Sequence, residues 1–134
     1  GHGLRLNKRA IHAYAQSMME KYDVRATSDS QSVRELSGGN QQKVIIAREL
    51  ESGPSVLVMA HPTRGLDIGA TSFVHDQMIA ARARGVGILL ISADFDEILE
   101  MSDRIVVCFE GRIMGEFSGS KPPINEISLA MTGK

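Results

Sequence analysis

The 134-residue sequence lacks the features of several specialised protein classes. Its single cysteine cannot form a disulfide within the chain, and no apolar run approaches the roughly 18 residues that a membrane span requires. The net charge of −1 gives no electrostatic basis for binding nucleic acid or anionic lipid. Apolar residues make up 43% and charged residues 23%, so we expect a soluble, cytosolic, globular domain that buries a core.

The one cysteine, Cys108, lies in the apolar run "RIVVCFE". A thiol in such a run usually acts as a small buried hydrophobe, so we expect a structural role and not a reactive one. Gly1 and His2 resemble a cloning remnant, so we assign them no structural or functional role.

The first third of the chain is predicted to hold two helices joined by a polar loop. Apolar residues recur at three- and four-residue spacing from Leu4 to Tyr22, which is typical of an amphipathic helix. The polar stretch "RATSDSQSVRE" is predicted to be a loop. A second helix is expected from Asn40 to Glu51, where "SGP" ends it.

After Pro54 the sequence alternates between short apolar runs and helical patterns. The runs "SVLVM", "VGILLI" and "RIVVCF" suit central strands of a parallel sheet that is covered on both faces. Helices are expected at 70–84, with one apolar stripe, and over "DFDEILEM". This order predicts an α/β layer with right-handed crossovers. A tight turn at "EGR", a hairpin edge "RIMGEF", the linker "SGSKPP" and a helix from Ile124 to Met131 complete the chain.

The stretch "ELSGGNQQK" places a serine and two glycines directly before a helix. The free N–H groups and positive dipole end of such a helix attract anions, and glycine lets phosphate oxygens approach the backbone. Ser37 adds a hydroxyl donor. An ordinary N-cap explains the same residues, and for this stretch alone it is the better explanation.

Four stretches in order, "LSGGNQQK", "SVLVMAHPTRGLD", "GILLISADFDEIL" and "SDRIVVCFEGRIMGEF", resemble the nucleotide-binding subunit of ATP-binding cassette (ABC) transporters, especially nucleoside and simple-sugar importers. The resemblance covers nearly the whole chain. It implies a P-loop NTPase fragment of α/β class, in which Leu36, Ser37, Gly38, Gly39 and Asn40 contact the γ-phosphate of ATP held by an opposite domain. Asp67 matches the family's dimer-interface aspartate, although "PTRGLDIGA" is also ordinary turn chemistry.

The chain departs from the family pattern at three places. No G-x-x-x-x-G-K-[ST] phosphate loop occurs, so we expect the chain to be a fragment that begins after that loop. The family's metal-associated aspartate and catalytic glutamate fall on Ala60 and His61, and its switch histidine falls on Ala93. An alanine offers no oxygen to magnesium, and a general-base role for His61 is disfavoured because its metal partner is missing.

The resemblance, taken with these losses, implies a hydrolytically degenerate second domain that completes the ATP site of its partner. It implies no catalytic or metal-binding residue in this chain, magnesium held only through the partner domain, and a peripheral position on the cytoplasmic side of the inner membrane beside permease subunits. Residues 1–53 then form a helical subdomain with the signature motif, 54–117 part of the ATPase core, and 118–134 a linker and helix.

Two alternatives remain open. One is a non-catalytic interaction scaffold derived from such an ATPase; the other, a cassette ATPase of DNA repair, is disfavoured because no coiled-coil insert separates the signature from "SVLVM". Removal of a neighbouring strand is expected to expose apolar edges on "SVLVM" and "VGILLI", so we expect the isolated chain to self-associate.

Other residues with potential chemistry have simpler explanations. The acidic residues of "DFDEILEMSD" are expected to interact favourably with the dipole at the start of a helix. Phe95, Ile98 and Leu99 of the same helix are expected to face inward. His12 and His75 have no metal ligands at suitable spacing, and the basic residues Arg5, Lys8 and Arg9 are expected to form a solvated face.

Overall fold

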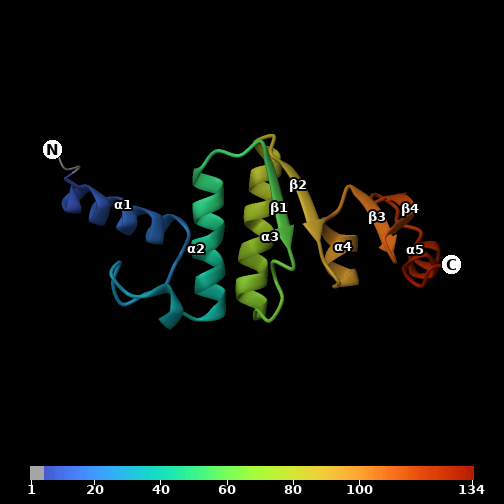
Figure 1. Cartoon of the computed structure of the whole chain (residues 1–134), viewed down its shortest axis with the longest axis horizontal. Helices are drawn as coiled ribbons and strands as arrows, with labels where there is room; N and C mark the ends of the chain where they lie inside the picture. Colours follow the sequence, from blue (N-terminus) through green and yellow to red (C-terminus); the bar gives the residue numbers. More distant parts are fainter. Residues whose placement is uncertain (1–4) are drawn as a thin grey trace. The chain divides into compact units, whose positions relative to one another are not determined.

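The computed structural model of the chain describes residues 5–134, so Gly1, His2 and Leu4 lie outside the described residues (Figure 1). Contacts within the chain define two compact units. The first unit comprises Gly1–Leu57 and Pro62–Leu89, and the second comprises Val58–His61 and Leu90–Lys134. Each unit has its own buried apolar residues.

The first unit begins with helix α1, Lys8–Lys21. Asn7 caps it by accepting a hydrogen bond from the Ala10 N–H group, which explains why the helix starts later than its apolar pattern. No residue of α1 is buried. The following Tyr22 is 3% exposed, and its hydroxyl donates to Glu51 at 2.6 Å. The end of α1 is therefore fixed to the end of helix α2.

Helices α2, Gly38–Glu51, and α3, Ile68–Ala83, lie side by side and form the core of the first unit (Figure 1). Buried residues of α2 are Ile46, Ala47 and Leu50, and those of α3 are Val74, Met78 and Ala81. The apolar stripe predicted for the helix at 70–84 is confirmed by the burial of its members Val74, Met78 and Ala81. The predicted loop before α2 contains a short 3₁₀ turn, η1, Val33–Glu35.

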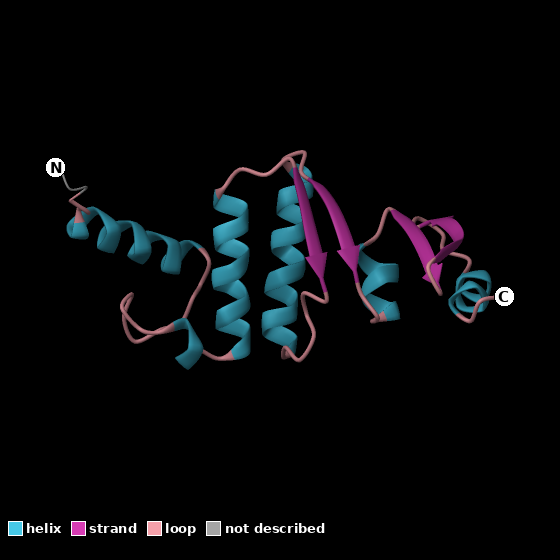
Figure 2. Cartoon of the chain, viewed as in Figure 1, coloured by secondary structure: helices cyan, strands magenta, loops and turns pink. Residues whose placement is uncertain are grey.

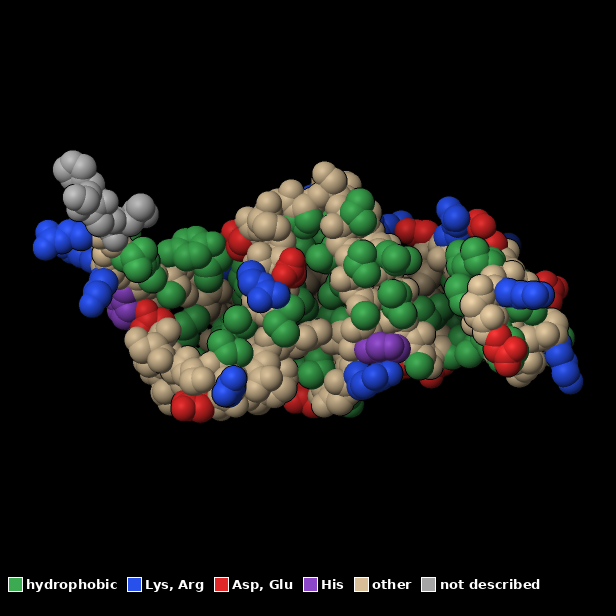
Figure 3. Space-filling view, in the orientation of Figure 1, with side chains coloured by type: hydrophobic (Ala, Val, Ile, Leu, Met, Phe, Trp, Pro, Cys, Tyr) green, Lys and Arg blue, Asp and Glu red, His purple; other side chains and the backbone are tan. Residues whose placement is uncertain are grey.

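Strands β1, Val56–Ala60, and β2, Gly87–Ile91, form a two-stranded parallel sheet (Figure 2). Both strands match the prediction, but the expectation that both faces are covered is wrong within this chain. Leu57 and Met59 are buried, whereas Val56 and Val58 are 66% and 60% exposed. Strand β2 also exposes Leu89 and Ile91, and apolar side chains are visible at the molecular surface in Figure 3.

The second unit contains helix α4, Phe95–Met101, strands β3, Arg104–Phe109, and β4, Arg112–Ser118, and helix α5, Ile124–Met131. Its buried cluster consists of Ile105, Val107, Ile127 and Ala130. Phe95, Ile98 and Leu99 of α4 pack against this cluster, as predicted. Asp94 caps α4 through the Glu97 N–H group, and Glu97 itself is buried, which the sequence pattern does not indicate.

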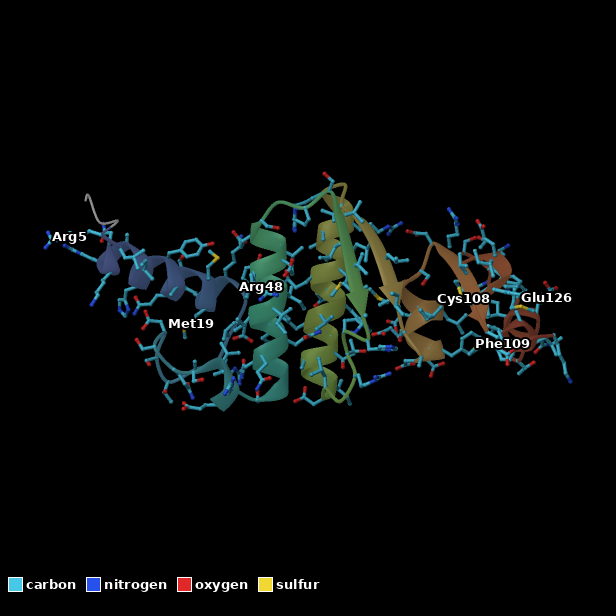
Figure 4. All side chains as sticks on the ribbon, viewed as in Figure 1. Arg5, Met19, Arg48, Cys108, Phe109 and Glu126 are labelled. Atoms are coloured by element: carbon cyan, nitrogen blue, oxygen red, sulfur yellow. The ribbon has the colours of Figure 1, made fainter. Side chains whose placement is uncertain are left out.

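Strand β3 corrects two predictions. It does not continue the parallel sheet; it pairs antiparallel with β4, from Arg104 opposite Ser118 to Phe109 opposite Arg112. The reason is the two-residue turn at Glu110 and Gly111, whose positive φ angles of 47° and 76° suit a tight hairpin. Cys108 is exposed on β3, and not buried as expected, because it alternates with the buried Val107 (Figure 4).

Candidate functional site

The serine–glycine turn forms the start of α2. Ser37 has an extended backbone, with φ −59° and ψ 157°, and its hydroxyl accepts a hydrogen bond from the Asn40 N–H group at 3.3 Å. The first backbone bond of the helix runs from the Gln41 N–H group to the Ser37 carbonyl. The N–H groups of Gly38 and Gly39 precede this bond, so they belong to the donors that an α-helix leaves without an intrahelical partner.

The residue before the turn, Leu36, is half-buried and held by backbone and side-chain bonds. Its N–H group donates to the Val33 carbonyl at 3.1 Å, and its own carbonyl accepts from the Gln41 side-chain amide at 2.9 Å. These bonds close the η1 turn onto the first turn of α2. The entry into the helix is therefore fixed from both sides of Ser37.

The two glycines differ in their surroundings. A Cβ atom at Gly39 would lie 3.0 Å from the Ala70 Cβ, whereas one at Gly38 would have its nearest neighbour, the Leu66 Cδ2, at 4.0 Å. Carbon atoms are most stable about 3.5–4.0 Å apart, so the close packing of α2 against α3 favours glycine at position 39, where a Cβ atom would force a shift of a few tenths of an ångström. Packing places no such requirement on Gly38.

Asp67 caps helix α3. Its carboxylate accepts a hydrogen bond from the Ala70 N–H group at 2.8 Å, and its side chain is exposed. Ala70 is also the residue that faces Gly39, so the structure brings the glycine turn and the Asp67 loop together. The ordinary turn and cap chemistry considered for "PTRGLDIGA" is present here.

Asn40 completes the set of predicted residues, and its side chain is engaged at both ends. The Nδ2 group donates to the Ser37 hydroxyl at 3.0 Å, and the Oδ1 atom accepts from the Arg25 N–H group at 2.8 Å. All six predicted site residues thus lie at the adjoining starts of α2 and α3. The bond to Arg25 joins residues that are 15 positions apart, and no local spacing in the sequence indicates it.

Two further side chains of α2 support the site and are not indicated by the sequence pattern. Gln42 donates to the Pro62 carbonyl at 2.7 Å. Lys43 donates to the backbone carbonyl and the carboxylate of Asp23, at 2.8 and 3.1 Å, and lies 4.9 Å above the Phe73 ring. The Lys43 ammonium lowers the pKa of the Asp23 carboxyl. These contacts connect α2 to the turn after α1, to the loop after β1 and to α3.

The residues at the ends of β1 and β2 belong to the second unit. Ala60 and Ala93 are exposed, and His61 is half-buried with a φ angle of 49°, which is uncommon for a residue with a side chain. The His61 N–H group donates to the Ile91 carbonyl at 2.7 Å. The two alanine side chains carry no polar atom that could bind a metal or a phosphate.

Residues 5–134 contain no cluster of three His, Cys, Asp or Glu side chains with metal-binding geometry. Within the same residues, no helix has the length and apolar character needed to cross a bilayer.

The predicted basic face at Arg5, Lys8 and Arg9 is exposed. His12 pairs with Asp29, a partner that is distant in sequence.

The sequence of the chain is similar to those of known ATP-binding proteins of importers. The chain is 44% identical over 128 residues to the nucleoside import ATP-binding protein NupA of Lactococcus lactis, a match that covers 96% of this chain and 25% of the relative. It is 40% identical over 132 residues to the ribose import ATP-binding protein RbsA of Lacticaseibacillus paracasei, covering 98% of this chain and 26% of the relative. The chain therefore spans about a quarter of the length of these curated relatives.

Solved structures give the fold. The ADP conformation of MJ1267, an ATP-binding cassette of an ABC transporter, superposes with a TM-score of 0.73 at 24% identity, over 100% of this chain and 54% of that chain. No protein-family model matches the sequence. Along nearly its whole length, the chain is homologous to a segment of the ATP-binding subunits of ABC importers for nucleosides and sugars, and it has the fold of part of an ABC ATPase domain.

Proposed function

We propose that this chain supplies the signature motif to an ATP molecule held by a partner nucleotide-binding domain of an ABC importer for nucleosides or simple sugars. The phosphate-contacting segment is Leu36 to Asn40, with Asp67 in the adjoining loop at the domain interface. Any magnesium ion at the ATP is held by residues of the partner domain and not by this chain. The assembled ATPase lies on the cytoplasmic side of the membrane, bound to permease subunits.

The geometry at the start of α2 supports this proposal. The N–H groups of Gly38 and Gly39 and the Ser37 hydroxyl lie in one helical turn, at the positive end of the helix dipole. Ser37 and Gly38 are exposed, so a ligand can reach them from solvent. The observation that carries the proposal is Gly38: packing allows an alanine there, so the fold alone does not account for its glycine.

We further propose that the chain's own hydrolytic site is degenerate and that it forms the second cassette of a fused pair. Hydrolysis needs a phosphate cradle, a metal ligand and a group that positions water. Ala60 and Ala93 stand where the family pattern has a metal-associated aspartate and a switch histidine, so methyl groups replace two of the polar side chains that this chemistry uses. A half-buried histidine at position 61 without a neighbouring carboxylate at position 60 does not rebuild this chemistry.

The test measures how tightly the assembled transport ATPase that contains this chain binds a non-hydrolysable ATP analogue with Mg²⁺. Gly38→Asp places a carboxylate at the phosphate without a close packing contact and is expected to weaken binding at least tenfold. Ser37→Ala is expected to weaken it about 10- to 100-fold, since hydrogen bonds to charged groups contribute about 1.5–3 kcal/mol. Ser52→Ala, at the opposite end of α2, is the matched control. Unchanged affinity in both Ser37→Ala and Gly38→Asp would refute the proposal.

The alternative of an interaction scaffold predicts a different result. A scaffold binds its protein partner without nucleotide, so adding this chain to a cassette that holds ATP would leave the affinity for ATP unchanged. Our proposal predicts that the chain tightens that affinity and that Ser37→Ala reduces the gain. Fluorescence titration of the cassette with a labelled ATP analogue, with and without the chain, separates the two functions.

We also propose that the isolated chain self-associates through the exposed residues of its parallel sheet. Three apolar side chains of this sheet are each more than half exposed: Val56 and Val58 of β1 and Leu89 of β2. A two-stranded sheet has unpaired strand edges, which can form hydrogen bonds with a strand of another copy. Val58→Lys is expected to shift the chain toward monomer in light scattering. Ile68→Lys, on α3, replaces a residue that is 87% exposed and is the control. A wild-type chain that stays monomeric at high concentration would contradict this proposal.

A further inference from the structure

Asn40 differs from the other residues of the motif because both ends of its side chain already have partners. Its Oδ1 atom accepts from the Arg25 N–H group at 2.8 Å, and its Nδ2 group donates to the Ser37 hydroxyl at 3.0 Å. The side chain is half-buried, whereas Ser37 is exposed. A residue that contacts phosphate through its amide would have to give up at least one of these bonds.

The direction of the amide is set by Arg25. A backbone N–H group can only donate, so it selects the oxygen end of the Asn40 amide and leaves the nitrogen end facing Ser37. Turning the amide over would place an N–H donor of Asn40 against the Arg25 N–H donor, and it would make the Ser37 hydroxyl the donor to Asn40. The Arg25 backbone thus fixes which end of Asn40 meets the serine hydroxyl.

These bonds limit the hydrogen bonds that the Ser37 hydroxyl can still form with a ligand. A hydroxyl offers one donor and two acceptor positions. Its Oγ atom accepts from the Asn40 N–H group at 3.3 Å and from the Asn40 Nδ2 group at 3.0 Å, which occupies both acceptor positions. The remaining capacity is the O–H donor. A ligand that only accepts hydrogen bonds, such as a phosphate oxygen, matches this hydroxyl, and a ligand that donates does not.

We infer that Asn40 is a positioning residue that holds the Ser37 hydroxyl as a donor for the γ-phosphate, and that its amide does not contact the nucleotide. This inference rests on the proposed function and revises one part of it, since the family resemblance includes Asn40 among the contacting residues. The positioning begins at the turn after α1, because Lys43 fixes Asp23 two residues before Arg25. The path of the loop at Arg25 thereby sets which end of the Asn40 amide faces the Ser37 hydroxyl.

A double-mutant cycle tests the inference in the assembled transport ATPase that contains this chain. The variants are Ser37→Ala, Asn40→Ala and the double variant, and the measured quantity is the Kd of a non-hydrolysable ATP analogue with Mg²⁺. Ser37→Ala is expected to weaken binding about 10- to 100-fold and Asn40→Ala about 3- to 10-fold. Because Asn40 acts through Ser37, adding Asn40→Ala to Ser37→Ala is expected to weaken binding less than about twofold further.

The cycle distinguishes this mechanism from two others. If Asn40 contacts the nucleotide itself, the effects of the two substitutions multiply, and the inference is overturned. If Asn40 only stabilises the fold, Asn40→Ala weakens binding equally in both backgrounds and lowers the melting temperature in proportion, which also overturns it. If Ser37→Ala has no effect on Kd, the proposed function fails first, so the two failures are distinguishable.

Asn40→Asp provides a second variant that keeps the fold. A carboxylate retains the acceptor for the Arg25 N–H group and is favourable near a helix N-terminus. It cannot donate to Ser37; instead it accepts a hydrogen bond from the Ser37 hydroxyl, which directs the O–H group away from the ligand. We expect Asn40→Asp to weaken binding at least as much as Asn40→Ala in wild type, with a smaller loss in the Ser37→Ala background. Equal losses in both backgrounds would show charge repulsion alone and contradict the inference.

Discussion

Alanine at Gly38 and at Gly39 gives a matched pair of substitutions whose effects on stability differ for a single structural reason. Both residues lie in the first turn of α2, where replacing glycine by alanine stabilises a helix by up to about 1 kcal/mol. At position 38 the new methyl meets the Leu66 side chain at 4.0 Å, an ordinary contact distance. At position 39 it meets the Ala70 Cβ at 3.0 Å, so the facing atoms of α2 and α3 must shift apart by a few tenths of an ångström.

The expected magnitude is set by this contact. Overpacking of a well-packed contact costs about 1–3 kcal/mol, so Gly39→Ala is expected to be less stable than Gly38→Ala by that amount. For a chain of this length, each kcal/mol corresponds to a shift of about 3–5 °C in melting temperature. Thermal unfolding followed by circular dichroism, with urea unfolding as a second measure, detects a difference of this size.

Removing the opposing methyl provides the internal check. Ala70→Gly alone is expected to destabilise the chain by about 1 kcal/mol, because glycine disfavours helix α3. Combined with Gly39→Ala it relieves the contact, so its cost in that background is smaller or absent. If Gly39→Ala proves as stable as Gly38→Ala, or if Ala70→Gly costs the same in both backgrounds, the packing argument is wrong.

Three further predictions concern other contacts of the first unit. Burial and the bond to Glu51 raise the pKa of Tyr22 to about 12, so the proton is held more tightly in the folded state and stability is lost as the pH rises from about 10 to 12. Tyr22→Phe removes this alkaline loss and Tyr14→Phe, at an exposed position, does not. Lys43→Met is expected to cost about 1–3 kcal/mol in urea unfolding, against less than about 0.5 kcal/mol for Arg48→Met. The lowered pKa values of Asp23 and Glu51 predict that stability falls as acid protonates them below their ordinary pKa values, and Asp23→Asn reduces that fall.

The positions of most helices and strands can be predicted because they depend on local patterns. The predicted helix 124–131 coincides with α5, and the glycine stop at position 85 matches its positive φ of 90°. The predicted start of α1 is several residues too early, because apolar spacing continues past the cap at Asn7. Capping by a side chain decides where such a helix begins, whatever the pattern around it.

The errors in the sheet have a different physical origin. Apolar runs without alternation suggest strands covered on both faces, but the run "SVLVM" leaves Val56 and Val58 exposed here. The apolar composition of a strand indicates that burial of both faces is favourable. It does not indicate whether the element that would cover a face belongs to this chain. For β3, the nearby hairpin turn at Glu110 and Gly111 decides the pairing partner, and the sequence contains that turn.

The candidate site is predictable in its residues and unpredictable in its connections. The motif "LSGGN" and Asp67 can be found as strings, and their adjacency results from the packing of α2 on α3. The bonds from Asn40 to Arg25 and from Lys43 to Asp23 join residues 15 and 20 positions apart. No periodicity predicts such contacts, because they depend on the path of the loop between α1 and α2.

The two glycines of the motif therefore have separate explanations, and Gly38 is the one that bears on function. Close packing accounts for Gly39, whereas Gly38 is exposed and an alanine there fits and favours the helix. A residue that sacrifices stability without a packing reason is typical of a binding position, where a side chain would hold a ligand away from the backbone. Gly38→Ala is accordingly expected to raise the melting temperature of the chain and to weaken binding of the ATP analogue about tenfold in the assembled ATPase. A stabilised variant with unchanged affinity would remove the main structural support for a phosphate at this helix.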